Sequence, residues 1–202
     1  LVTKHMKPKI INACPNIQIG GIPKASSVEH LVVLKTWMKL KEETKEGGII
    51  QTFDMEKFFD KESLVDTMFT LKTRADIDNK DYRLWFKLNE DARISVRTSV
   101  GESESKLIKN SLGQGFFGAA LPSSLNIGCA IKDTFQETSS TNIGTLPLNA
   151  VVMQDDIAKL NDNINQARDG CHKIRNTLIR KQLSVNHDKC KYLIVGPKKF
   201  RE

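Results

Sequence analysis

Two acidic signatures, each at the end of an apolar, strand-like run, constrain this chain more than any other feature. The run FDMEKFFD begins at Phe53, and the run VVMQDD begins at Val151. Their apolar character favours strands over Ile49–Asp54 and Ala150–Asp156. If these strands are neighbours in one sheet, both deliver a carboxylate to the same edge.

The carboxylates at these strand ends indicate chemistry. We expect Asp54 and Asp155 to lie together. Clustered carboxylates repel one another, and a hard divalent cation such as Mg²⁺ relieves the repulsion. Two such cations about 4 Å apart hold the attacking and leaving oxygens of a phosphoryl transfer. Alone, Asp155 and Asp156 are more typical of a turn, because Asp bonds nearby backbone N–H groups. Together, the two signatures favour catalysis.

The rest of the chain alternates between helical and strand patterns, which predicts an α+β fold with a small antiparallel sheet backed by helices. Proline and glycine residues predict that residues 1–25 are rich in loops. Further elements are predicted as follows: a helix from Ser26 or Ser27 to Glu46, a helix over 119–135, a hairpin over 146–160, a long amphipathic helix after Asp162, and a closing strand over 192–195.

Four short motifs follow one another in an order that resembles the palm domain of a reverse transcriptase of the retroelement type. They are, in sequence order, Asp54 with Phe59 five residues later, Gly113-Gln114-Gly115, Met153-Gln154-Asp155-Asp156, and the run from Leu183 to Lys189. These resemble motifs A to D of that family. Upstream, residues 18–30 resemble the stretch that joins fingers to palm in that family, so the likeness covers nearly the whole chain.

The resemblance implies an RNA-directed DNA polymerase, a nucleotidyltransferase that extends a primer 3′-hydroxyl by two-metal catalysis. Asp54 and Asp155 would be the catalytic metal ligands, and Asp156 the supporting one. The implied cofactor is Mg²⁺ or Mn²⁺. The implied partners are an RNA template, a DNA primer and deoxynucleoside triphosphates.

The resemblance also implies four positions that contact the nucleotide. Phe59 would lie beneath the sugar, where a bulky ring excludes a ribose 2′-hydroxyl. Gln114 and Gly115 would bring a flexible turn against the nucleotide, and Lys189 would place a cation near the leaving pyrophosphate. From the residues alone, at least one of Phe58 and Phe59 is expected to pack in the core, and Lys189 is equally a solvated surface lysine.

The same resemblance suggests how the chain is organised. Residues 1–48 would be a partial fingers region with a connecting helix, and residues 49–202 would be the palm. The thumb of such a polymerase follows the fourth motif, so we expect this chain to lack it. A palm without a thumb should hold a primer and template weakly.

Composition agrees with a nucleic-acid partner. The chain has 31 Lys and Arg against 24 Asp and Glu, a net charge of +7, which suits a polyanion. Its four cysteines lack the paired spacing of a zinc site, which favours a reduced compartment, in the cytoplasm or nucleus. No apolar run is long enough to span a membrane, so no membrane partner is expected. The sequence indicates no oligomeric state.

Two alternatives remain open. A viral RNA-directed RNA polymerase also carries paired aspartates in its third motif, although Phe59 argues against this class. A catalytically decayed palm that only binds nucleic acid is favoured by Met153, where the reverse transcriptase family usually has an aromatic residue. The sequence after Gly115, which departs from the usual pattern, favours the same alternative.

Overall fold

A four-stranded antiparallel sheet forms the centre of the molecule, in the strand order β10-β1-β9-β8. Its strands are β1 (Gly48–Phe53), β8 (Ala150–Met153), β9 (Asp156–Asn161) and β10 (Lys191–Val195). The computed structural model describes residues 2–108, 111–113, 118–136, 141–143 and 145–197. A small antiparallel sheet within an α+β fold is therefore what the sequence predicted.

The strand neighbours differ from the prediction. The strand over 150–156 was expected beside β1, but β9 lies between β1 and β8. The predicted hairpin is present as β8 and β9, but its first strand ends at Met153. The chain turns back at Gln154 and Asp155, and Gln154 adopts the left-handed conformation with φ of 57°. The returning strand β9 then pairs with β1, so that Phe53 is opposite Ile157.

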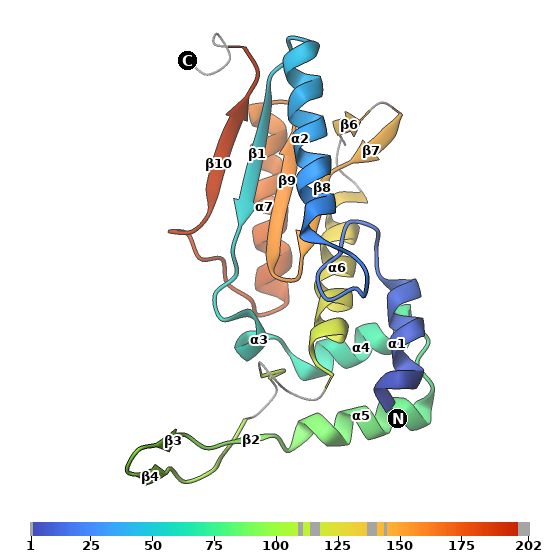
Figure 1. The fold of residues 1–202 in the computed structure, drawn as a ribbon, viewed down its shortest axis with the longest axis vertical. Coiled ribbons are helices and arrows are strands. Elements are labelled where there is room, and N and C mark those ends of the chain that lie inside the picture. The colour runs from blue at the N-terminus through green and yellow to red at the C-terminus, as the bar shows by residue number, and fades with distance from the viewer. Residues whose placement is uncertain (1, 109–110, 114–117, 137–140, 144, 198–202) are drawn as a thin grey trace.

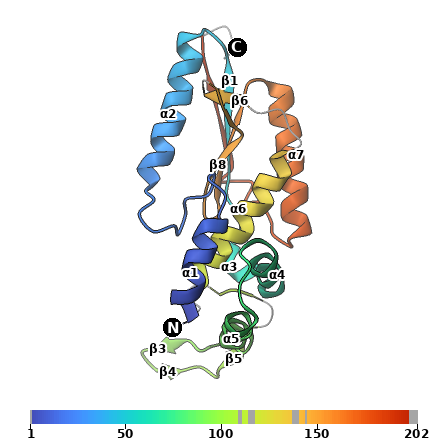
Figure 2. The same ribbon diagram turned by 90° about the vertical axis from the view of Figure 1, so that its right-hand side faces the viewer.

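Helices cover both faces of the sheet, as Figure 2 shows. One face packs on α2 (Ser27–Glu43), and the other on α6 (Ala120–Gln136) and α7 (Ile164–Arg180). Alternate residues of each strand point to opposite faces. Accordingly, one core contains residues of β1, β8 and β9 with those of α6 and α7, among them Phe53, Val152, Ile157, Ile127 and Ile174. A smaller core on the α2 side contains Trp37, Ile50, Leu160 and Val195.

A second group of helices lies beyond one end of the sheet (Figure 1). It consists of α1 (Val2–Ala13), α4 (Leu64–Arg74) and α5 (Asn79–Glu90), which pack with α6 around the buried Trp85. The helix α1 corrects the expectation of a loop over residues 1–25. Met6 and Ile10 lie one helical turn apart and are both buried in this core, while Pro8 is exposed. Their burial outweighs the poor helix propensity of the proline.

The remaining elements are short. They are α3 (Phe58–Lys61), β2 (Arg93–Ile94), β3 (Arg97–Thr98), β4 (Gly101–Glu102), β5 (Lys106–Leu107), β6 (Thr141–Ile143) and β7 (Leu146–Leu148). The strands β2 to β5 form an exposed ribbon that extends from the end of α5 (Figure 1). None of the described helices has the length and apolar character needed to cross a membrane.

A buried lysine is an unexpected member of the core. Lys159 on β9 is only 1% exposed, and its ammonium lies 4.7 Å from the centre of the Phe135 ring. Gly170 of α7 makes this possible, since a Cβ at that position would come within 2.3 Å of the Lys159 side chain. Burial lowers the pKa of Lys159 from 10.5 to about 8.

We expect Lys159→Met to raise the free energy of unfolding at pH 7 by about 3 kcal/mol, because one pKa unit corresponds to about 1.4 kcal/mol. At pH 7 the folded protein must bury a charged ammonium. The wild-type penalty declines as pH rises from about 8 towards 10.5, because the unfolded chain there binds more protons than the folded one. The gain should therefore shrink between pH 7 and pH 10 in urea unfolding.

The control for this measurement is Lys132→Met, because Lys132 is an exposed lysine on α6. It should leave the unfolding free energy nearly unchanged at every pH. A gain for Lys159→Met that stays constant with pH would contradict the lowered pKa and would point to better packing alone.

Candidate functional site

The sheet places Asp54 and Asp156 at neighbouring positions on two adjacent strands. Asp54 follows the last residue of β1, and Asp156 is the first residue of β9. The pairing of Phe53 with Ile157, continued by one residue, sets Asp54 opposite Asp156. Residues opposite each other in an antiparallel pair have Cβ atoms about 4.5–5.5 Å apart. Both side chains line one pocket of about 210 Å³ on the α2 side.

Asp155 lies in the turn between β8 and β9 instead of on a strand beside Asp54. Burial raises the pKa of its carboxyl, and the charges of Asp156 and Asp54 raise it further. Burial also raises the pKa of Asp156, with a further contribution from Asp54. The three aspartates therefore act on one another electrostatically, which is the arrangement that a divalent cation would relieve.

The fourth motif is joined to the first by backbone pairing. Val185 forms an isolated antiparallel bridge with Met55, and the Asn186 N–H donates to the Asp54 carbonyl at 2.8 Å. This pairing carries Lys189 to the carboxylates, where its Nζ lies 3.4 Å from Asp54 Oδ2. The Lys189 side chain is 67% exposed, so it is free to approach a bound anion as well.

The same pocket contains a histidine for which the sequence analysis gave no role. His30 of α2 lines it together with Thr52, Asp54, Asp156 and Lys189. Burial lowers the pKa of His30, and the imidazole is hydrogen-bonded to the backbone of Ile17. Its Nε2 is buried and has no partner among the described residues. Nothing in the sequence around His30 distinguishes it from an ordinary residue in the first turn of a helix.

The donor atoms at this site fit a hard divalent cation. Asp54 Oδ2 is buried and accepts no hydrogen bond from the described residues, and a cation bound there would replace its ion pair with Lys189. Within the described ranges, no three His, Cys, Asp or Glu side chains converge closely enough to hold a metal ion by themselves. Mg²⁺ is commonly held by one or two carboxylates together with substrate phosphates. Asp54 and Asp156 fit that kind of shared site.

The residues predicted to contact the nucleotide are only partly described. Phe59 lies in α3 and is half-buried against the core shared with α6 and α7. Its ring packs edge-on against Phe58, with 5.2 Å between ring centres. Gln114 and Gly115 lie outside the described residues. The structure thus brings Asp54, Asp156 and Lys189 to one pocket, with Asp155 in the adjoining turn. Their roles, like that of Phe59, stay predictions.

A buried polar network links several helices of the fold. Asn126 of α6 donates to Glu62 Oε1 at 3.0 Å, and its Oδ1 accepts from Thr70 at 2.8 Å and from Lys181 at 2.9 Å. Lys181 also forms an ion pair with Asp66 at 2.7 Å. Glu62 is 1% exposed, and burial raises the pKa of its carboxyl. The network joins α4, α6 and the C-terminal end of α7.

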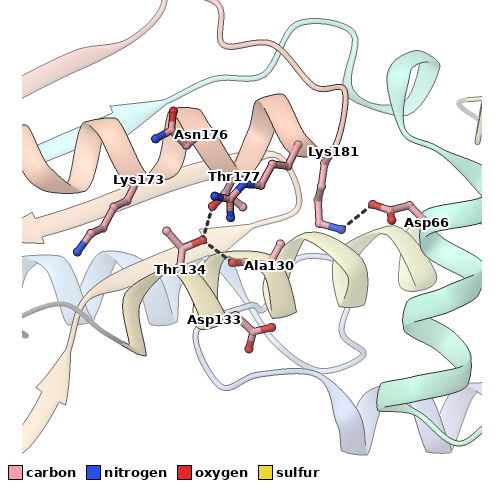
Figure 3. Close-up of a pocket in the computed structure, with 9 residues that line it drawn as sticks. Asp66, Ala130, Asp133, Thr134, Lys173, Asn176, Thr177 and Lys181 are labelled. Carbon is pink, nitrogen blue, oxygen red and sulfur yellow. Dashed lines mark hydrogen bonds and ion pairs between the residues drawn. The ribbon is translucent and has the colours of Figure 1, made fainter.

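A polar pocket of about 570 Å³ lies beside this network, between α6 and α7. Figure 3 shows Lys181 reaching Asp66 across it, and the Thr134 hydroxyl paired with Thr177 at 2.7 Å. None of the predicted site residues lines this pocket. It is therefore separate from the carboxylate site.

Gln18 contacts the acidic turn, but the sequence analysis predicted no function for it. It was noted only as part of the stretch that joins fingers to palm, without a role. In the structure it is 2% exposed and hydrogen-bonded to the turn that contains Asp155. A glutamine in a loop carries no local signal of a contact with a residue 136 positions away.

Comparison with known proteins shows the fold. No protein-family model and no curated protein matches the sequence. The chain resembles the structure of apo telomerase from Candida tropicalis, truncated from the C-terminal domain, with 16% identity and a TM-score of 0.71 over 96% of this chain and 40% of that one. It also resembles telomerases in complex with the TWJ fragment of telomeric RNA. For Candida tropicalis the identity is 14% and the TM-score 0.72 over 96% of this chain and 33% of that one. For Candida albicans the identity is 15% and the TM-score 0.69, over 95% of this chain and 34% of that one.

The chain spans between a third and two fifths of the length of these telomerase chains. Telomerase is a reverse transcriptase-related enzyme, so the chain has a reverse-transcriptase-like fold. The predicted α+β class, with helices backing a small antiparallel sheet, is confirmed. The boundary predicted at residue 48, between fingers and palm, stays a prediction.

Proposed function

We propose that this chain is the catalytic palm region of an RNA-directed DNA polymerase of retroelement type. It would extend a DNA primer on an RNA template, using deoxynucleoside triphosphates and Mg²⁺ or Mn²⁺. The observation that carries the proposal is the placement of Asp54 opposite Asp156, with Asp155 in the adjoining turn and within electrostatic range of both, in a reverse-transcriptase-like fold. These carboxylates come from two motifs that resemble the catalytic ones of that family.

Each residue of the site has a distinct task in the proposed reaction. Asp54, Asp155 and Asp156 would hold the divalent cations. When bound, such cations lower the pKa of the primer hydroxyl and offset the charge that builds on the transferring phosphate. Lys189, 3.4 Å from Asp54, offsets part of the carboxylate charge before substrate binds. Its exposed ammonium would then turn to the phosphates of the nucleotide.

The telomerase comparisons support a nucleic-acid partner, because two of those structures are complexes with a fragment of telomeric RNA. Net charge points the same way, since +7 favours binding to a polyanion. Binding of this kind releases counterions and should weaken steeply with salt. The assignment of an RNA template and a DNA primer as partners rests on the motif resemblance.

The proposal is tested with the 202-residue chain and a DNA primer annealed to an RNA template. We expect salt-sensitive binding and slow addition of a single deoxynucleotide that requires Mg²⁺ or Mn²⁺. Mn²⁺ binding, followed by electron paramagnetic resonance, gives a second readout that needs no turnover. Binding of Mn²⁺ without any nucleotide addition would support the decayed palm instead. Absence of both Mn²⁺ binding and addition would overturn the proposal.

A variant at Phe59 tests the preference for deoxyribose over ribose. Phe59→Val should raise the incorporation of ribonucleotides relative to deoxyribonucleotides by about tenfold or more, because a smaller side chain admits the 2′-hydroxyl and tenfold corresponds to only about 1.4 kcal/mol. The ratio of kcat/KM values for the two sugars is the measurement. Phe58→Val is the matched control, because Phe58 is fully within the core and should change stability without changing the ratio. An unchanged ratio for Phe59→Val would assign Phe59 to packing or favour the viral RNA polymerase alternative.

A further inference from the structure

The segment around Gln18 runs alongside the strand that leads to the acidic turn. Gln18 forms a parallel bridge with Val152 of β8. The Val152 N–H donates to the Ile17 carbonyl at 2.7 Å, and the Ile19 N–H donates to the Val152 carbonyl at 3.0 Å. These bonds occupy the edge of β8 that β9 leaves open, so the segment is fixed to the sheet.

The Gln18 side chain continues this pairing onto the turn itself. Its Oε1 accepts from the Gln154 N–H at 2.9 Å and from the Gly20 N–H at 2.7 Å. Its Nε2 donates to the Gln154 carbonyl at 3.3 Å. The carboxamide thus engages both backbone groups of Gln154, as a neighbouring strand would. Gln154 is the residue immediately before Asp155 and Asp156.

Gly20 completes this contact by lacking a side chain. A Cβ at Gly20 would lie 2.1 Å from the Gln154 nitrogen, a distance that no side chain could tolerate. On the other side of Gln18, a Cβ at Gly128 of α6 would lie 2.9 Å from the Gln18 Cβ. Gln18 is therefore enclosed between α6 and the turn, and its carboxamide has little freedom to move.

The turn needs such support for two reasons. Gln154 has φ of 57°, a left-handed conformation that a residue with a side chain adopts at a cost of about 1 kcal/mol or more. In addition, like charges on Asp155, Asp156 and Asp54 repel each other and push the turn away from β1. Each of the contacts from Gln18 opposes that displacement.

We propose that Gln18 is a positioning residue that fixes the Asp155–Asp156 turn against Asp54. The inference rests on the proposed function for its consequence in metal binding, but the contact itself can be tested separately. Residues that orient metal ligands without touching the metal typically change metal affinity or activity by about 10–100-fold when replaced. We therefore expect Gln18 to affect Mn²⁺ binding on that scale.

Three variants of the 202-residue chain test the proposal. Gln18→Met keeps the size of the side chain and removes all its hydrogen bonds. Gln18→Glu keeps an oxygen that can accept from the Gln154 N–H but loses the bond to the Gln154 carbonyl. Gln166→Met is the matched control, because Gln166 also accepts a bond from a backbone N–H, that of Asp162 at 2.7 Å, but caps α7 instead of the turn.

The readouts are amide hydrogen exchange at Gln154 and Mn²⁺ affinity by electron paramagnetic resonance. Gln18→Met should speed exchange at Gln154 about tenfold, as expected for loss of roughly 1.4 kcal/mol of hydrogen bonding, and weaken Mn²⁺ binding about tenfold or more. Gln18→Glu should keep the Gln154 protection, and Gln166→Met should leave both readouts unchanged. The two Gln18 variants should therefore differ at this one amide, and the Mn²⁺ affinity shows whether the contact matters to the metal ligands.

The outcomes separate this inference from the proposed function. Unchanged exchange at Gln154 in Gln18→Met would overturn the positioning role. Faster exchange with unchanged Mn²⁺ affinity would also overturn it, because the turn would then be free without consequence for the ligands. If the wild-type chain binds no Mn²⁺ at all, the proposed function fails, and the exchange data still decide whether Gln18 holds the turn.

Discussion

We expect Asp54→Asn to slow nucleotide addition by about a thousandfold while leaving the fold intact. Metal stabilisation of the charge on the transferring phosphate is worth several kcal/mol, and each 1.4 kcal/mol is a factor of ten in rate. Asparagine keeps the shape of the side chain but removes the negative charge. The lost ion pair with Lys189 should cost little stability, since Lys189 is largely exposed. Single-turnover addition of one nucleotide measures the effect.

Asp60→Asn is the matched control, because Asp60 is an exposed aspartate of α3 only six positions further along the chain. It removes the same charge from the same region and should leave the rate nearly unchanged. Mn²⁺ affinity should fall for Asp54→Asn and stay the same for Asp60→Asn. Equal losses of rate in the two variants would show that overall charge, and not a metal ligand at Asp54, governs the reaction.

The second large effect is expected on stability. Asn126→Leu should lower the free energy of unfolding by about 3 kcal/mol, because a buried polar group that loses its partner costs about 1–3 kcal/mol. Thr70 loses its acceptor, and Glu62 loses one donor but keeps the bond from Thr67 at 3.0 Å. The substitution removes the Asn126 bonds to Glu62, Thr70 and Lys181 at once. Glu62 and Thr70 are both buried, so water does not replace the lost partner. Urea unfolding at pH 7 gives the measurement.

The control for Asn126→Leu is Asn176→Leu, because Asn176 is an exposed asparagine on α7 at the rim of the pocket in Figure 3. It makes the same chemical change and should alter the unfolding free energy by less than about 0.5 kcal/mol. A small effect at Asn126 would mean that Glu62 and Thr70 find new partners by rearrangement of α4. Chemical shifts of α4 would then differ from those of the wild type.

The sequence by itself determined the elements that depend on local patterns. The helix predicted over 119–135 is α6 at Ala120–Gln136, and the strand predicted over 192–195 lies within β10. The first acidic signature lies at the end of β1, as its apolar flank indicated, and the second follows the apolar strand β8. The periodicity of apolar side chains involves residues only a few positions apart, so these elements can be predicted without knowing the fold.

Only the tertiary structure decided which segments meet. In the structure β9 lies between β1 and β8, so that Asp156 and not Asp155 is opposite Asp54. The tertiary structure folded the first residues into α1 because Met6 and Ile10 are buried there. It also placed Gln18 on the turn and Lys159 inside the core. Pairing and burial depend on contacts between residues far apart in the chain. A short stretch of sequence does not determine the energy of those contacts.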